Sequence, residues 1–462
     1  MPGALVPERL SSGWVLALTA AAQFVLQLDF AIVNVALPTV QRDLGFTEAG
    51  LQWVVTGYAL TFGALLLVGG RFGDLIGYRR AVIGGLALFA LTSLSGGLAT
   101  GGGVLVASRM VQGASAALIA PAALALLAHA HPEPRARIRA MGIFQGSVAA
   151  GASAGIVLGG VLTQYVGWRS VLLINPPLIL VLIALILWRV PAIPGHSGIR
   201  LDLPGALTAT GATAALILGV SQGQQNGFGS PSSWIALVAA AVLAVAFVAV
   251  ERRIADPMLP FSLLRGDGRP AALVAILVIG AVLAGYVYFV SMYLQHVLAF
   301  SALQTGLALV PATLTAFVVS TQVARRVLPR LGFRRQLLLA LLLVGAGQLW
   351  LSQVTATGSY VVNVLAGILL TAAGMGLALP AASLALTAEA PPHQRGIAGA
   401  LFASGQQVGS AIGIAVLATI AAASTDTTGD LVSGYRLSFL VATGLIALAV
   451  IATAVPRTRR TA

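Results

Sequence analysis

Long apolar segments recur along the whole chain and exclude most folds other than those of helical membrane proteins. Breaking the sequence at its polar and Pro/Gly-rich joints gives fourteen segments of about 20 residues, each long enough to cross a membrane as a helix. Only 8% of the residues are charged, against roughly 25% in a soluble domain, so lipid must be the main solvent. The chain is therefore predicted to be an all-α integral membrane protein. The expected spans are 13–37, 50–70, 80–99, 103–127, 139–163, 169–190, 203–221, 233–251, 271–294, 304–325, 335–354, 359–382, 396–421 and 433–455.

The arginines predict the orientation of these spans. With the N-terminus inside, 22 of the 26 basic residues fall in cytoplasmic segments, and only Arg42, Arg169 and Arg436 fall outside. Positive residues gather on the cytoplasmic side of membranes. Both termini are therefore expected in the cytoplasm, with the chain in the cell membrane, and the net charge of +13 indicates topology rather than a nucleic-acid partner.

The residue types that the chain lacks exclude several kinds of chemistry. It has no cysteine and no lysine, so disulfides, thiolate nucleophiles and a GxxxxGK[ST] phosphate loop are excluded. The five histidines fall in joints or near span ends, and no metal-ligand spacing or nucleophile–base pair stands out. We expect no enzyme activity, no metal and no cofactor other than a driving ion gradient, and we expect a monomer.

An internal repeat predicts two related halves. The joint GYRR at 77–80 recurs as GFRR at 332–335, 255 residues later. Arg137, Phe144, Gly151 and Gly155 recur 258 residues later as Arg395, Phe402, Gly409 and Gly413. Two six-helix bundles, 1–190 and 271–462, with two inserted helices in 191–270, would give this spacing, and related halves around a central site are a common transporter plan. The insert is expected to begin at the N-cap Asp202, with Pro204 in the first turn, and its two helices are expected to contain no ionisable residue and to have no coupling role.

Four motifs stand in an order that resembles a known family. They are LDFAIVNVALP (28–38), GGRFGDLIGYRR (69–80), SRMVQGASAA (108–117) and GASAGIVLGG (151–160), the last with Ile156 where proline is usual. Together they resemble the major facilitator superfamily, specifically its fourteen-span drug:proton antiporter branch. The resemblance implies the major facilitator fold, with two six-helix bundles plus two inserted helices, and multidrug or antibiotic efflux by alternating access.

Asp29 is the acidic residue that lies deep in an expected span. It is nine residues before Pro38, about 13 Å from the outer end of the helix at the helical rise. Ionisable residues inside spans are functional by default, because a charge in hydrocarbon is costly. We expect Asp29 either to carry the coupled proton or to anchor helix packing by a hydrogen bond. Arg109, about 9 Å deep in the fourth span, is expected either to pair with Asp29 or to bridge helices through backbone carbonyls.

Amide side chains form a stripe on the same first span. Gln23, Gln27 and Asn34 share one face at spacings of four and seven, whereas Asp29 lies about 160° from Gln27 at 100° per residue. Asp29 and the stripe cannot both face one cavity. Either the stripe meets cargo while Asp29 faces a neighbouring helix, or the reverse holds.

The joint after the second span predicts a gate. Asp74 with Arg79 and Arg80 is expected to form a charge clasp between helix ends that holds in one conformation and releases in the other. The second half has Pro329 at the equivalent of Asp74. Positive-inside charge alone would explain the two arginines but not the acid.

The remaining candidates fall into two groups. Glycines at GxxxG spacing let helices approach closely, for packing alone or for sliding during transport; these are Gly151, Gly155, Gly409 and Gly413. Side chains suited to hold an aromatic or cationic cargo by polar, stacking or cation–π contacts are Gln112, Tyr286, Phe289, Tyr293, Asn363, Gln406 and Gln407. Tyr293 alternatively belongs to an interfacial aromatic belt.

The predicted function is proton-coupled export of hydrophobic or cationic small molecules such as drugs or antibiotics. A first alternative keeps the fold but exports an endogenous metabolite or runs as a symporter; a polar cargo would require more buried charge than Asp29 and Arg109 provide. A second alternative, a scaffold or sensor without transport, is expected to carry an appended soluble domain, and Met1–Ser12 and Pro456–Ala462 are too short for one.

Overall fold

The computed structural model is all-helical in the residues that it describes, which are 12–191, 202–254, 257, 259, 269–387 and 395–454. Each of the fourteen expected spans contains a helix, and the sixth consists of two, α6 and α7, which meet at Ile174. In chain order the helices are α1 (Ser12–Leu44), α2 (Glu48–Ile76), α3 (Tyr78–Gly97), α4 (Gly102–Ala130), α5 (Pro134–Tyr165), α6 (Arg169–Leu173), α7 (Asn175–Arg189), α8 (Leu203–Asn226), α9 (Pro231–Glu251), α10 (Arg269–Met292), η2 (Tyr293–Val297), α11 (Ala302–Val318), η3 (Val319–Val323), α12 (Ala324–Leu351), η4 (Tyr360–Leu365), α13 (Ala366–Thr387), α14 (Arg395–Thr428) and α15 (Leu431–Ala454).

Thirteen helical stretches of the described chain are long and apolar enough to cross a membrane. The longest, Gln304–Leu351, has 48 residues and would extend about 72 Å at the rise of an α-helix, more than twice the thickness of a hydrocarbon core. It is interrupted at Gly332, where φ is 72° and ψ is 168°. We infer that it crosses the membrane twice, which gives fourteen spans.

The repeat found in the sequence has the same geometry in both halves. Gly77, between α2 and α3, has φ 94°, and Gly332, its equivalent in the repeat, also has positive φ. Glycine adopts this region at little cost because it has no Cβ. The arginine two residues later donates to a carbonyl at the end of the last helix of its own half in each case. Arg79 donates to Leu187 O of α7 at 2.8 Å, and Arg334 donates to Thr453 O of α15 at 2.7 Å.

Small residues allow α1 and α5 to pack backbone against backbone. A Cβ added at Gly151 would lie 2.5 Å from Phe24 O, and one at Gly155 would lie 2.6 Å from Leu28 O. Both distances are far inside van der Waals contact, so no larger residue fits unless the helices separate. The predicted close approach at the GxxxG glycines is therefore present in the first half.

The second half repeats this packing between α10 and α14. A Cβ at Gly409 would collide with the backbone of Leu277, and one at Gly413 would collide with the backbone of Ala281. Leu277 and Ala281 lie four residues apart, as Phe24 and Leu28 do. The two halves thus bring their first and fifth spans together in the same register.

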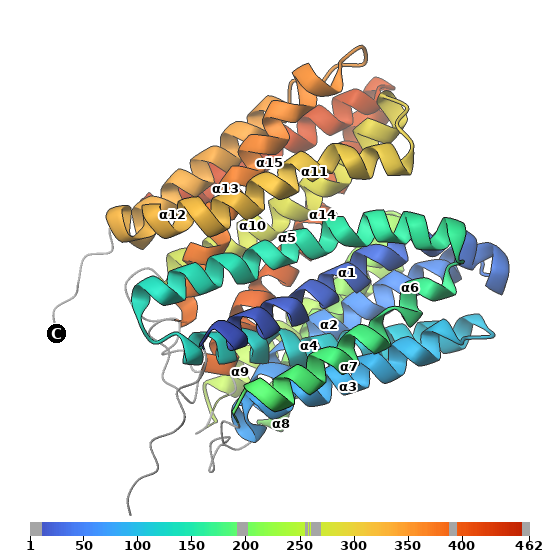
Figure 1. The fold of residues 1–462 in the computed structure, drawn as a ribbon. Coiled ribbons are helices and arrows are strands. Elements are labelled where there is room, and N and C mark those ends of the chain that lie inside the picture. The colour runs from blue at the N-terminus through green and yellow to red at the C-terminus, as the bar shows by residue number, and fades with distance from the viewer. Residues whose placement is uncertain are drawn as a thin grey trace, which may run out of the picture.

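The two bundles meet along two seams. Figure 1 shows the C-terminal bundle, coloured yellow to red, against the blue to green N-terminal bundle, with α5 facing α11. The second seam joins α2 to α14. At the first seam, Ser153 Oγ donates to Thr313 Oγ1 at 2.7 Å. At the end of the bundles where α2 ends and α14 begins, buried apolar residues of α14, from Ile397 to Phe402, join the core of the N-terminal bundle.

The inserted helices α8 and α9 pack against each other, and α8 also contacts α2 and α14. Asp202 caps α8 as predicted, since its Oδ1 accepts a hydrogen bond from Gly205 N at 2.8 Å. The prediction that the helices of the insert contain no ionisable residue is wrong. Glu251 is the last residue of α9 and is only 2% exposed, and its Oε2 accepts from Leu259 N at 3.0 Å. This contact with Leu259, outside the helix, shows that a residue at a helix end is buried by tertiary structure.

Candidate functional site

Asp29 and Arg109 form an ion pair in the interior of the N-terminal bundle. Arg109 Nη1 donates to Asp29 Oδ2 at 2.6 Å, and the side chains are 1% and 0% exposed. Asp29 comes from the middle of α1 and Arg109 from the second turn of α4. The two helices pack together, so two charges that each sit in an apolar span neutralise one another. The structure thus brings together the two residues that the sequence singled out.

Three neutral side chains complete this network. Asn175, at the start of α7, donates from Nδ2 to Asp29 Oδ1 at 2.7 Å and to Ser93 Oγ of α3 at 2.9 Å. Gln112 accepts from Arg109 Nη1 at 2.8 Å and donates to Ser93 Oγ at 2.9 Å. Both carboxylate oxygens of Asp29 therefore have donors, which a buried charge requires. Gln112, predicted to contact cargo, is 0% exposed and belongs to this network.

Arg109 also bridges to α2, so both of its predicted roles are realised in the geometry. Its Nε donates to Val54 O at 3.2 Å. One turn further along α2, the ring of Tyr58 lies against the guanidinium, with Cζ 4.4 Å from the ring centroid. Tyr58 is 3% exposed, and a cation over an aromatic face is most stabilising when desolvated. Arg109 therefore links α1, α2 and α4.

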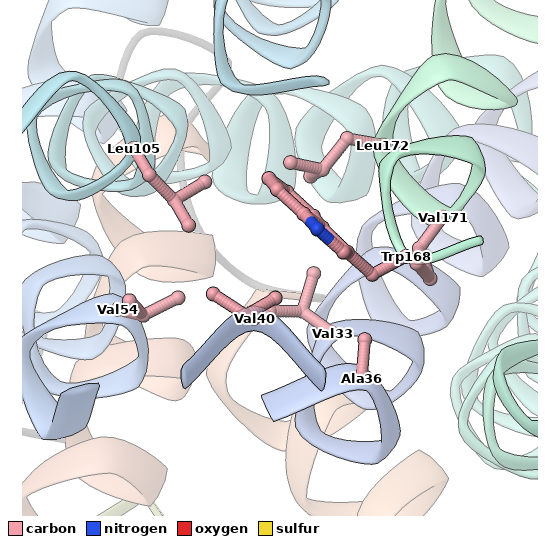
Figure 2. A pocket seen from close by; sticks show the side chains of 8 residues that line it. All are labelled: Val33, Ala36, Val40, Val54, Leu105, Trp168, Val171 and Leu172. Carbon is pink, nitrogen blue, oxygen red and sulfur yellow. The ribbon is translucent and has the colours of Figure 1, made fainter. Parts of the chain in front are cut away.

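A small apolar cavity closes the bundle beyond the ion pair. Figure 2 shows the indole of Trp168 reaching between Leu105 and Leu172. The volume that the centre of a water molecule could occupy in this cavity is about 10 Å³. This is barely enough for one water, which would also need polar partners. The lining offers apolar side chains only: Val33, Ala36, Val40, Val54, Leu105, Trp168, Val171 and Leu172. This end of the network is consequently dry.

The amide stripe occupies a different face of α1. Gln23 is 8% exposed and its Oε1 has no hydrogen-bond partner among the described residues; Gln27 is half-buried; Asn34 is exposed and donates to Phe30 O at 2.7 Å. We call Gln23, Gln27, Phe30 and Asn34 the amide face. Amide groups facing lipid would be costly, so we infer that this face lines a passage. Of the two arrangements left open by the sequence, the structure has Asp29 facing the neighbouring helices.

Asp74 connects the two bundles. Its Oδ1 accepts from Tyr78 Oη at 2.8 Å, and its Oδ2 accepts from Ile397 N, in the first turn of α14, at 3.2 Å. Asp74 is 1% exposed. The predicted clasp of Asp74 with Arg79 and Arg80 is not what the structure shows. Arg79 instead donates to the end of α7, as described above, and Arg80 is exposed. The physical reason is that a helix N-terminus offers free N–H groups and a partial positive charge, which bind a carboxylate as an arginine does.

The other predicted cargo residues lie elsewhere. Tyr286, Phe289 and Tyr293 are 6%, 2% and 1% exposed and belong to the core of the C-terminal bundle. Phe289 packs on Phe439 and Tyr435, so these rings stabilise the fold and offer no free face to cargo in this structure. Their helix has apolar side chains on every face, so the sequence did not show which face points into the core.

The three predicted amides of the C-terminal half also have specific positions. Asn363 accepts from Ser359 N at 2.8 Å at the start of η4, where it acts as a local cap. Gln406 is half-buried, with its backbone against Gly280 of α10, and Gln407 is half-buried, with its Cβ facing Gly63 of α2. Gln407 therefore lies at the seam between α2 and α14.

Three residues of the network, Asn175, Ser93 and Tyr58, were missed by the sequence reasoning. Each is a polar residue in a largely apolar span, and Asn175 also precedes a Pro-Pro pair that breaks the helix. That signal was available, but nothing in the sequence connected the three with Asp29. No group of three or more His, Cys, Asp or Glu side chains that could hold a metal occurs among the residues described.

Comparison with known proteins gives a consistent result. The family model described as Major Facilitator Superfamily matches residues 19–414 and 330–462. The cephamycin export protein CmcT of Amycolatopsis lactamdurans is 38% identical, with 96% of this chain and 93% of that protein covered. The puromycin resistance protein pur8 of Streptomyces alboniger is 37% identical, with 94% and 89% covered. Among solved structures, the human organic anion transporter MFSD10 has a TM-score of 0.73 at 17% identity, with 96% and 99% covered, which supports the fold. The chain is a multi-pass membrane transporter that belongs to the major facilitator superfamily.

Proposed function

We propose that this transporter exports hydrophobic or cationic antibiotics across the cell membrane in exchange for protons, as a monomer with both termini in the cytoplasm. The names of the relatives, one an exporter of cephamycin and one a puromycin resistance protein, support antibiotics as cargo. The proton-coupling role rests on one observation, the fully buried pair of Asp29 and Arg109. The proton gradient is the expected driving force, and no other cofactor is required.

The energetics of this pair give the coupling a physical basis. A proton on Asp29 removes the negative half of the pair and leaves the Arg109 charge uncompensated inside the bundle. One-sided loss of a buried ion pair costs about 3–5 kcal/mol. The protonated protein is therefore expected to change the packing of α1 against α4 and α2, and a ligand that favours one arrangement shifts the proton equilibrium in turn.

The contact of Asp74 with α14 supplies the gate in this proposal. It crosses from the N-terminal to the C-terminal bundle at the end expected to face the cytoplasm. It can exist only while the bundles are closed there, so it favours the conformation that is open to the outside. Its release would accompany opening toward the cytoplasm, where cargo enters.

The experiment is proton-driven transport by purified protein in liposomes, with puromycin as cargo and an imposed pH gradient. Asp29→Asn keeps the size of the side chain and removes its charge, and is expected to abolish gradient-driven uptake. The matched control is Asp43→Asn: Asp43 also lies on α1 and pairs with an arginine, Arg169, at 3.8 Å, but is 47% exposed. Gradient-driven transport at the wild-type rate by Asp29→Asn, or equal loss in both variants, would remove the coupling role from Asp29.

A further inference from the structure

An aromatic contact connects the amide face with the buried ion pair. Phe30, the residue after Asp29, is 36% exposed on the amide face. Its ring centroid lies 5.7 Å from that of Tyr58, with 42° between the ring planes. Tyr58 is buried and also lies 6.0 Å from the ring of Phe62, centroid to centroid. Phe30 is therefore the exposed end of an aromatic cluster that continues into the bundle.

The buried end of this cluster touches the ion pair. Tyr58 lies 4.4 Å from Cζ of Arg109, and Arg109 holds Asp29. The carbonyl of Val54, one turn before Tyr58, accepts from the same guanidinium. A change in the position of α2 or in the tilt of the Tyr58 ring therefore acts directly on Arg109. The two carboxylate oxygens of Asp29 bind Arg109 and Asn175, so no exposed residue like Phe30 contacts the Asp29 side chain directly among the residues described.

We propose that Phe30 binds an aromatic ring of the cargo and that Tyr58 is the positioning residue through which this binding acts on the pair of Arg109 and Asp29. This inference rests on the proposed function and adds a cargo class, molecules with an exposed aromatic ring. Such a ring stacks on Phe30 at the offset or tilted geometry that aromatic pairs prefer. It reorients Tyr58, changes the cation–π contact with Arg109, and so changes the affinity of Asp29 for a proton. By linkage, the proton changes the affinity for the cargo by the same factor.

Few other ionisable groups could account for such coupling. Among the residues described around Asp29, α4 contributes Arg109 and α2 contributes Tyr58, whereas α3 and α7 contribute the neutral Ser93 and Asn175. The pair of Asp43 and Arg169 lies near the outer end of α1, fourteen residues from Asp29, and is exposed. A pH dependence of cargo binding that requires Tyr58 is therefore attributable to the buried pair.

The test measures equilibrium binding of two antibiotics to the purified full chain at pH 6 and pH 8. Puromycin has aromatic rings, and lincomycin, an amine that is also cationic when protonated, has none. Wild type is expected to bind puromycin about 10-fold more tightly at pH 8 than at pH 6, within the usual range of coupling. Phe30→Leu is expected to weaken puromycin binding about 5- to 10-fold and to reduce its pH dependence to less than about 2-fold. Binding of lincomycin by Phe30→Leu is expected to equal that of wild type.

Tyr58 is tested by a pair of substitutions. Tyr58→Met fills similar space without a π face, and is expected to retain puromycin binding while its pH dependence falls below about 2-fold. Tyr58→Phe keeps the ring and is expected to retain the wild-type pH dependence, which a merely structural role for the residue would not require. If Tyr58→Met does not fold, the Phe30→Leu result still decides, because Phe30 is exposed and its loss leaves no buried cavity.

Three outcomes would overturn the inference. They are no binding of puromycin to wild type, equal loss of both antibiotics in Phe30→Leu, and an unchanged pH dependence in both Phe30→Leu and Tyr58→Met. None of these three outcomes decides the role of Asp29, which the Asp29→Asn transport assay tests separately. Conversely, wild-type proton-driven transport by Asp29→Asn would reject the proposed function even if Phe30 bound aromatic cargo.

Discussion

Substitution of Asp74 should change the equilibrium between the two conformations by a predictable amount. Asp74 accepts one hydrogen bond from Tyr78, within the N-terminal bundle, and one from Ile397 N, which crosses to α14. A hydrogen bond to a charged acceptor contributes about 1.5–3 kcal/mol, against about 0.5–1.5 kcal/mol for a neutral one. Asp74→Asn should therefore destabilise the closed gate by about 1 kcal/mol, which is a factor of about 5 in the conformational equilibrium. Asp74→Ala should shift it about 10-fold or more.

The absence of cysteine in the chain makes this shift directly measurable. Spin labels at Arg80→Cys on α3 and Arg330→Cys on α12 would report the separation of the bundles at the gate end, since both side chains are exposed there. Electron–electron distance measurements should show the fraction with a long distance rising in the order wild type, Asp74→Asn, Asp74→Ala. Transport should slow in the same order while cargo still binds.

The control is Asp43→Asn in the same labelled background. The pair of Asp43 with Arg169 is exposed and lies within one bundle, and exposed pairs contribute about 0–1 kcal/mol to stability. This variant should leave the distance distribution unchanged. Indistinguishable distributions for wild type and Asp74→Ala would refute the reasoning, because they would mean that the contact with α14 does not bias the gate.

Two further substitutions test the packing around the pair. Asn175→Ala should lower the stability by about 1–3 kcal/mol, because one oxygen of a buried carboxylate loses its donor; thermal unfolding in detergent measures this, and equal stability of Asn175→Ala and the exposed control Asn226→Ala would contradict it. Gly155→Val should destabilise by about 1–3 kcal/mol through overpacking of α5 against α1, whereas Gly160→Val on the same helix has no atom within 4 Å of the added Cβ and should be nearly neutral. Similar melting temperatures for the two glycine variants would show that α1 and α5 can separate at little cost.

The number of spans, the repeat and the two candidate charges were readable from the sequence because each is a local or periodic property. An uninterrupted run of about 20 apolar residues predicts a spanning helix whatever surrounds it. A single carboxylate in such a run is conspicuous for the same reason, as Asp29 was. The turn between repeated spans was readable as GYRR and GFRR, because glycine supplies the positive φ that both turns adopt.

The partners of those charges depended on how each helix is rotated about its axis. In a soluble protein the polar face of a helix reveals this rotation, but here lipid-facing and core-facing residues are equally apolar. The sequence therefore could not show that Tyr286, Phe289 and Tyr293 point into a core. Nor could it show that α14 would offer its N-terminus to Asp74, because the hydrogen-bonding capacity of a backbone N–H is the same in every residue but proline.

The amino-acid sequence alone thus determined that this protein is embedded in the membrane, spans it repeatedly, and carries an acidic and a basic side chain, Asp29 and Arg109, within the spans of its first half. The three-dimensional packing alone decided that the acid and base meet, that Asn175 and Tyr58 complete their surroundings, and that the amide face turns away from them. The reason is that the cost of burying a charge is set by one residue and its solvent, whereas the group that compensates it can come from any helix that packs within hydrogen-bonding distance.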